Sequence, residues 1–188
     1  GPGAYGETIA LLGIGAISRH LLKLLEPFNL RIIAVSNYLS DAEAKNMGID
    51  QLVDIDTCFR EAIVVSNQFA DKPQSRGILN KAHFVSMREG ATFINTGRGA
   101  QVDEAGLIDV LKERNDLTAL LDVQDPEPPL VESELYTLPN VHMTSHVGGS
   151  MNDEIGRMAD FVIEDFRAWK AGGALLHQVD PAAFKQRA

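Results

Sequence analysis

The sequence is poor in cysteine, in aromatic residues and in positive charge, and it has no long apolar run. Its 188 residues include one cysteine, Cys58. A single cysteine excludes an internal disulfide framework and a zinc site built on several cysteines. No apolar run approaches the roughly 20 residues of a membrane span, and we see no secretory signal. We therefore expect a cytoplasmic protein with no membrane partner and no bound metal.

Acidic residues outnumber basic ones, 26 against 17, which gives a formal net charge of −9. Nucleic acids and anionic membrane surfaces are bound by basic faces, so we expect neither as a partner. The hydrophobic share of 45% is ordinary for a globular protein. A chain of this length is enough for about one domain with a full core.

The first residues do not look like part of a fold. Residues 1–7 begin Gly-Pro-Gly-Ala, which is typical of a tag remnant or linker, and an apolar run starts directly at Thr8. We expect the folded domain to span residues 8–172 and residues 173–188 to form a C-terminal tail. The abrupt start favours a piece cut from a longer chain.

Short apolar runs alternate with longer amphipathic segments along the chain. This alternation, with strands that are apolar almost throughout, is typical of a parallel sheet covered by helices on both faces. We predict a doubly wound, Rossmann-like α/β fold of about seven strands, whose ligands bind at the carboxyl ends of the strands. The predicted strands are 8–12, 31–35, 52–53, 63–66, 91–95, 117–123 and 141–144, and the predicted helices are 16–25, 41–47, 56–62, 80–86, 103–113 and 151–171.

A glycine loop, Gly13-Ile-Gly15-Ala-Ile-Ser18, follows the first predicted strand and opens the first helix. The first glycine allows a tight turn, and the second lets the backbone approach a pyrophosphate at the helix N-terminus. Ser18, at the third position, is small enough for the helix to pack close to the strand. Glycine turns after strands are common without any ligand, but the strand–turn–helix context predicts a dinucleotide site here.

The position that usually binds the adenosine ribose carries no acid. The second predicted strand ends in Val35-Ser36-Asn37, and the next carboxylate is Asp41. An acid at this point normally hydrogen-bonds the ribose hydroxyls of NAD, whereas a nearby arginine accommodates the 2′-phosphate of NADP. Neither stands here, so the choice between NAD and NADP stays open. The alternative is that Ser36 merely ends the strand.

Three loops after later strands hold candidate catalytic groups. Arg98 stands between Gly97 and Gly99, where glycines let the backbone pass near a ligand and an arginine can clamp a carboxylate. The alternatives are that Arg98 caps a helix or pairs with Asp103. Asp122 ends another strand, and Glu127 follows in a proline-rich loop that could equally be a solvated acidic loop.

The third loop carries a histidine. His146 follows the last predicted strand and precedes Gly148 and Gly149. Because a histidine pKa lies near neutral, His146 is a candidate general acid and base, whereas His142 lies within the strand and is interpreted as structural. A neighbouring carboxylate would orient the ring and raise its pKa.

With these segments in order, the chain resembles the cofactor-binding domain of the D-isomer-specific 2-hydroxyacid dehydrogenases. The resemblance runs from about Thr8 to about Val179. Its specific motifs are Asn95-Thr-Gly-Arg-Gly-Ala-Gln-Val-Asp103, then Asp122-Val with Glu127-Pro, then Pro139-Asn-Val with Thr144 and His146.

The resemblance implies an oxidoreductase that reduces a 2-keto acid to a 2-hydroxy acid with a nicotinamide dinucleotide, NAD or NADP. Arg98 would bind the substrate's carboxylate and carbonyl oxygen, His146 would exchange the proton, and Glu127 would pair with His146. Asp122 would lie beside the nicotinamide carboxamide. The family also implies a homodimer. The expected cofactor-binding residues are Gly13, Gly15, Ala16, Ile17, Ser36, Asn37, Thr96, Gly97, Asp122, Gly148 and Gly149.

The chain departs from the family at several points. Ser18 and Ser36 replace the usual glycine and aspartate, and the segment from Ser66 to Ser75 departs from the family's histidine or leucine–proline stretch with two threonines. We expect the family's second, substrate-binding lobe to lie outside this sequence, and we expect this chain alone to be weakly active or inactive. The alternatives are a non-catalytic dinucleotide-binding module, as in the family's corepressor relatives, and a domain with decayed function.

Overall fold

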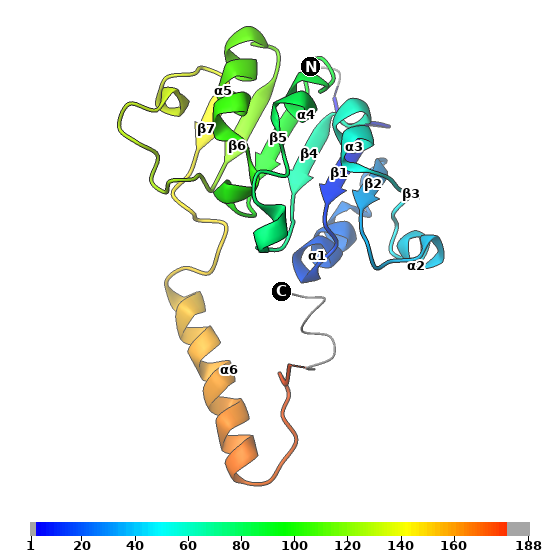
Figure 1. Ribbon diagram of the computed structural model, residues 1–188. Coiled ribbons are helices and arrows are strands. Elements are labelled where there is room, and N and C mark those ends of the chain that lie inside the picture. Colours follow the sequence, from blue (N-terminus) through cyan, green and yellow to red (C-terminus); the bar gives the residue numbers. More distant parts are fainter. Residues whose placement is uncertain (1–2, 180–188) are drawn as a thin grey trace. The chain divides into compact units, whose positions relative to one another are not determined.

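The computed structural model describes residues 3–179, and the chain divides into two compact units, residues 1–145 and 146–188. Each unit is described by itself. The first holds a seven-stranded sheet in the order β3-β2-β1-β4-β5-β6-β7, in which every neighbouring pair is parallel (Figure 1). The prediction of a doubly wound, Rossmann-like sheet of seven strands is confirmed. The strands are β1 (Thr8–Leu12), β2 (Arg31–Val35), β3 (Gln51–Leu52), β4 (Val64–Asn67), β5 (Thr92–Asn95), β6 (Thr118–Leu121) and β7 (Val141–Met143).

The strand order reverses between β1 and β4, because the chain adds β2 and β3 on one side of β1 and the later strands on the other. Such a switch point is where ligands bind in open α/β sheets. The α-helices of this unit connect the strands. They are α1 (Ala16–Leu25), α2 (Asp41–Asn46), α3 (Ile55–Glu61), α4 (Lys81–Val85) and α5 (Glu104–Glu113), with short 3₁₀ turns at Pro73–Ser75, Gly99–Gln101 and Glu134–Tyr136.

Several helices begin one residue away from the predicted position, because polar side chains cap them. Asn80 and Asp103, predicted as first helical residues, are the N-caps of α4 and α5 and accept hydrogen bonds from backbone N–H groups of the first turn. Asp54 caps α3 in the same way. Such caps satisfy N–H groups that have no partner within the helix. The predicted strand 117–123 is shorter in the structure, so Asp122 and Val123 lie in the loop after β6.

The core lies on both faces of the sheet, as the apolar strands predict. Side chains alternate along β1: Ala10 and Leu12 belong to one buried cluster, and Leu11 belongs to the other. The first cluster contains the rings of Phe59, Phe84 and Phe93, whose centroids lie 5.1–6.0 Å apart. The second cluster lies under α1 and α2 and includes Ile14, Leu22, Ile32 and Ala44.

The second unit contains one long helix, α6 (Asp153–Lys170), close to the predicted 151–171. Its apolar residues recur every three or four positions and form one stripe. The Asp165 carboxylate accepts hydrogen bonds from the backbone N–H groups of Leu176 and His177, at 2.9 and 3.0 Å, so the segment after α6 turns back along it. No helix within residues 3–179 combines the length and apolarity that crossing a bilayer requires. Parts of both predicted terminal segments, residues 1–2 and 180–188, lie outside the described residues.

Replacing Phe93 with alanine is expected to destabilise the first unit strongly. Phe93 is 1% exposed and contacts two other buried rings, so Phe93→Ala loses apolar burial and leaves a cavity. A loss of about 3–5 kcal/mol in the free energy of unfolding is expected, measured by urea denaturation. Phe28→Ala is the matched control, because Phe28 is 61% exposed and its loss is expected to change stability by less than about 1 kcal/mol. Equal losses for the two variants would contradict this account of the core.

Candidate active site

The glycine loop after β1 has the tight turn that the sequence predicts. Gly13 has φ +99°, a conformation that favours glycine, and a Cβ there would lie 2.9 Å from the carbonyl oxygen of Gln68. The Ser18 hydroxyl donates a 2.7 Å hydrogen bond to the carbonyl of Gly13, and Ser18 is buried. The serine in the third motif position therefore fastens the loop to the first turn of α1.

The N-terminus of α1 is open. Gly15 is the N-cap and supplies no side-chain cap, and a Cβ built on it would meet nothing within 4 Å. Ala16 and Ile17 begin the helix, and Ile17 is exposed. Backbone N–H groups at an uncapped helix start attract phosphate, and a glycine with free space above it lets a ligand come close. These residues fit the pyrophosphate of a dinucleotide.

The end of β2 reaches back to the glycine loop through a residue that sequence reasoning missed. The hydroxyl of Tyr38 donates a hydrogen bond to the carbonyl of Ile14, and the backbone N–H of Tyr38 donates to the Ser36 hydroxyl at 3.5 Å. Asn37, between them, is exposed. Ser36 thus helps to shape the turn after β2, beside the place where the sequence predicts the adenosine ribose.

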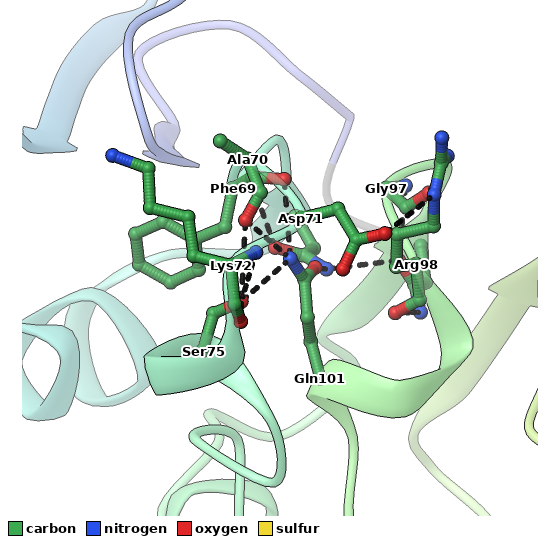
Figure 2. Close-up of polar contacts among 10 residues, drawn as sticks. Phe69, Ala70, Asp71, Lys72, Ser75, Gly97, Arg98 and Gln101 are labelled. Atoms are coloured by element: carbon green, nitrogen blue, oxygen red, sulfur yellow. Dashed lines mark hydrogen bonds and ion pairs between the residues drawn. The ribbon is translucent and has the colours of Figure 1, made fainter. Parts of the chain in front are cut away.

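A network of buried amide side chains ties together the loops after β4 and β5 (Figure 2). The amide nitrogen of Asn67 donates to the side-chain oxygens of Asn95, at 2.9 Å, and of Gln101, at 2.7 Å. The amide nitrogen of Gln101 donates to the carbonyls of Phe69, at 3.2 Å, and Ala70, at 2.9 Å. All three amide residues are at most 1% exposed. Because buried polar groups are costly to leave unpaired, the network holds these loops firmly.

Arg98 lies on this network. The amide of Asn95 donates to the carbonyl of Arg98 at 3.3 Å, and the Nη1 atom of Arg98 donates to the Gly97 carbonyl at 2.8 Å. Its Nε atom forms an ion pair with the Oδ2 atom of Asp71 at 3.5 Å. The alternative partner is wrong: Asp103 caps α5 by accepting from the N–H of Gly106. Nor does the arginine side chain cap the 3₁₀ turn that follows it.

The glycines beside Arg98 make room for neighbouring protein atoms. A Cβ on Gly99 would lie 2.0 Å from the backbone of Gln124, and one on Gly97 would lie 3.0 Å from the Asn67 amide and 3.1 Å from that of Gln101. Neighbouring protein atoms therefore already require small residues at both positions, and an approach of this backbone to a ligand stays a prediction. Gly99 brings the loop after β5 into contact with the loop after β6.

The loop after β6 carries the two acidic residues that the sequence predicts for the site, Asp122 and Glu127. Asp122 is buried and accepts a 2.5 Å hydrogen bond from the hydroxyl of Thr144, just after β7. Asp125 forms an ion pair with Arg76 at 3.3 Å. Burial raises the pKa of the Glu104 carboxyl, and the nearby charge of Asp125 raises it further, although a hydrogen bond from the Asp125 backbone opposes both. Glu127 follows in the same loop.

The predicted site residues are distributed over both units. In the first, Thr96, Gly97 and Arg98 follow β5, Asp122 follows the adjacent β6, and the hydroxyl of Thr96 accepts a 3.2 Å hydrogen bond from the Gln68 amide. His146, Gly148 and Gly149 begin the second unit, and His146 has φ +58°. His142 lies in the middle of β7 with its side chain exposed.

Sequence reasoning missed Asp71, Asn67, Asn95 and Gln101. Asn67 and Asn95 each end an apolar strand, and a polar residue at that position is a usable signal for a polar contact at the carboxyl edge. Nothing in the pattern of the sequence pairs Asp71 with Arg98 or Gln101 with the loop after β4. In residues 3–179 no three His, Cys, Asp or Glu side chains group as metal ligands would.

The chain is similar to known proteins of one family. Residues 1–148 match the family model of the D-isomer specific 2-hydroxyacid dehydrogenase, NAD binding domain. A D-3-phosphoglycerate dehydrogenase of Methanocaldococcus jannaschii is 30% identical over 163 residues, which are 87% of this chain and 31% of that protein.

Two solved structures are also similar. The TT0316 protein of Thermus thermophilus is 30% identical with a TM-score of 0.78, and the match covers 94% of this chain and 54% of that one. The D-lactate dehydrogenase of Escherichia coli is 27% identical with a TM-score of 0.75, covering 94% and 55%. The chain thus spans about a third to about half the length of these relatives. Because the family model matches most of the sequence, the chain belongs to the D-isomer-specific 2-hydroxyacid dehydrogenases and contains their NAD-binding domain.

Proposed function

We propose that this chain is the cofactor-binding part of an NAD(P)-dependent 2-hydroxyacid dehydrogenase, which reduces a 2-keto acid to a 2-hydroxy acid. The observation that carries the proposal is the position of Arg98, a half-exposed guanidinium held at the carboxyl edge of a dinucleotide-binding sheet. In this proposal residues 8–172 form the cofactor domain, residues 1–7 are a tag remnant or linker, and residues 173–188 lead toward a second, substrate-binding lobe.

The dinucleotide would be held at the glycine loop. The tight turn at Gly13 and the open N-cap at Gly15 support binding of its pyrophosphate by the first turn of α1. Ser36 and Asn37 would lie near the adenosine ribose, and Thr96, Gly97 and Asp122 near the nicotinamide. When bound, the reduced cofactor supplies the hydride. The lack of an acid at Ser36 removes the group that would repel a 2′-phosphate, so the site accepts NAD or NADP.

Arg98 would bind the substrate. A guanidinium offers two parallel N–H donors to a carboxylate and can polarise an adjacent carbonyl oxygen. The amide network below Arg98 supports this role, because a fixed backbone places the donors before the substrate arrives. The guanidinium would also stabilise the negative charge that develops on the carbonyl oxygen during reduction.

His146 would give a proton to that oxygen, and Glu127 would pair with His146. Chain connectivity supports this proposal. The hydroxyl of Thr144 donates to Asp122, and His146 follows Thr144 by two residues in the sequence. The positive φ of His146 is uncommon for a residue other than glycine, and such conformations cluster at functional sites.

We also propose that the protein is a cytoplasmic homodimer that binds no nucleic acid. The family to which the chain belongs supports dimerisation. The net charge of −9 supports the lack of a nucleic-acid partner. Light scattering is expected to give twice the mass of the chain, and a monomer at micromolar concentration would contradict the dimer.

This chain is expected to bind a nicotinamide dinucleotide on its own. Isothermal titration calorimetry with NADH and with NADPH tests this, and no binding of either at millimolar concentration would contradict it. Gly15→Val is expected to weaken binding at least about tenfold, or about 1.4 kcal/mol, because the new side chain fills the space above the loop without meeting protein. Gly156→Ala, a glycine of α6 with equal space around it, is the control and is expected to leave binding unchanged.

In the full-length protein, Arg98→Gln and His146→Gln are each expected to lower kcat/KM for 2-keto acid reduction by about 100-fold or more, because each removes a group that acts on the reacting oxygen. Steady-state kinetics with an array of 2-keto acids measures this. Arg60→Gln, on the surface of α3, is the matched control and is expected to retain activity. Unchanged activity of the His146 variant would refute its catalytic role, and partner binding by a wild type without any turnover would favour a corepressor-like module.

A further inference from the structure

The ion pair between Asp71 and Arg98 is formed by the part of the chain that departs from the family pattern. Asp71 lies in the Ser66–Ser75 segment, which does not follow the family's usual sequence. Its Oδ2 atom lies 3.5 Å from the Nε atom of the arginine to which the substrate carboxylate would bind. A carboxylate of the protein thus shares a guanidinium with the expected carboxylate of the substrate.

The backbone on both sides of this pair is fixed. Gln101 donates to the carbonyls of Phe69 and Ala70, directly before Asp71 (Figure 2). Asn95 donates to the carbonyl of Arg98 itself. The two side chains remain open to ligands, since that of Asp71 is 68% exposed and that of Arg98 is 51% exposed. The pair is therefore held in place by its backbone and yet accessible from solvent.

The arginine can hold a second anion. Its Nε faces Asp71 and its Nη1 donates to the Gly97 carbonyl, whereas its Nη2 has no hydrogen-bond or ion-pair partner among residues 3–145. A substrate carboxylate bound at the Nη edge would leave Asp71 in place, so the two negative charges would flank one positive charge.

Nearby cations do not offset this second negative charge. Arg76 forms an ion pair with Asp125 at 3.3 Å, and Figure 2 shows the Lys72 side chain extending away from Arg98. The loops after β4, β5 and β6, residues 68–80, 96–103 and 122–130, contain three basic and five acidic residues. A substrate with one negative charge is matched by Arg98, whereas a second charge next to the first is repelled.

We propose that Asp71 is a specificity-determining residue that acts through Arg98, and that it selects monoanionic 2-keto acids over those with a second anionic group near the reacting carbon. The inference rests on the proposed function and names its substrate class. Phosphorylated or dicarboxylic 2-keto acids would be poor substrates of this protein, because the Asp71 carboxylate would repel their second negative charge.

The test compares two small anions that resemble the reacting end of a 2-keto acid, oxamate with one charge and oxalate with two. Their dissociation constants are measured by calorimetry on the full-length protein saturated with reduced dinucleotide. Asp71→Asn keeps the shape of the side chain and removes its charge. Two charges about 6 Å apart interact strongly enough, even at the dielectric constant of water, to change a dissociation constant about threefold. Asp71→Asn is therefore expected to increase the affinity for oxalate relative to that for oxamate by at least about threefold.

Two further variants serve as controls. Asp109 lies on α5, has a similarly exposed carboxylate and pairs with Lys81 at 2.8 Å. Asp109→Asn is expected to leave the ratio of the two dissociation constants unchanged. Arg98→Gln is expected to weaken both anions. High salt is expected to shrink the effect of Asp71→Asn, because the Debye length is about 3 Å at 1 M, whereas a purely structural change in the loop would persist.

The outcomes separate the two proposals. If the wild type binds both anions and Asp71→Asn leaves their ratio unchanged, the role of Asp71 is refuted and the proposed function stands. If the wild type binds neither anion and reduces no 2-keto acid, the proposed function is refuted, and the inference falls with it. A ratio that moves equally in Asp71→Asn and Asp109→Asn would also refute a specific role for Asp71.

Discussion

Hydrogen bonds among three buried amides, those of Asn67, Asn95 and Gln101, hold together the loops on which the candidate site is built. Parallel pairing of β4 with β5 brings the ends of these strands to one edge of the sheet, but pairing alone does not fix the loops beyond them. The amides do so, because each donor faces a backbone carbonyl or another amide. In a buried site the cost of an unpaired polar group is high, so the arrangement tolerates little deviation.

An acidic protein can still carry groups suited to anions. The net charge of −9 describes the whole surface, whereas binding depends on a few oriented groups. Two such groups lie at the carboxyl edge of the sheet, the backbone N–H groups that begin α1 and the guanidinium of Arg98. The N–H groups of α1 carry a partial positive charge that the helix fixes in place. The guanidinium carries a full positive charge, which the nearby Asp71 carboxylate partly offsets. Acidic surroundings therefore do not prevent anion binding, but they limit how much negative charge a ligand can bring.

The sequence predicts the fold well because the relevant signals are local. Apolar runs mark the strands, and the glycine loop lies between β1 and α1 as its spacing requires. The contacts around Arg98 could not be predicted in the same way. Asp71 and Arg98 are 27 positions apart, and whether they pair depends on the path of two loops, which tertiary packing determines. The residue pattern identified Arg98 as a candidate and left two alternatives for it, a helix cap and a pair with Asp103, neither of which the structure shows.

The glycines show why a motif needs its structural context. Gly15 is the N-cap of α1 and Gly99 begins the 3₁₀ turn Gly99–Gln101, and from the sequence both are interpreted as places where a ligand comes close. A Cβ would meet open space at Gly15, but at Gly99 it would lie 2.0 Å from the backbone of Gln124. Gly15 therefore leaves space that a ligand can fill, whereas Gly99 lets two protein loops pack together. Since the packing at Gly99 joins the Arg98 loop to the loop that carries Asp122 and Glu127, this glycine helps to determine where the acidic loop lies relative to Arg98.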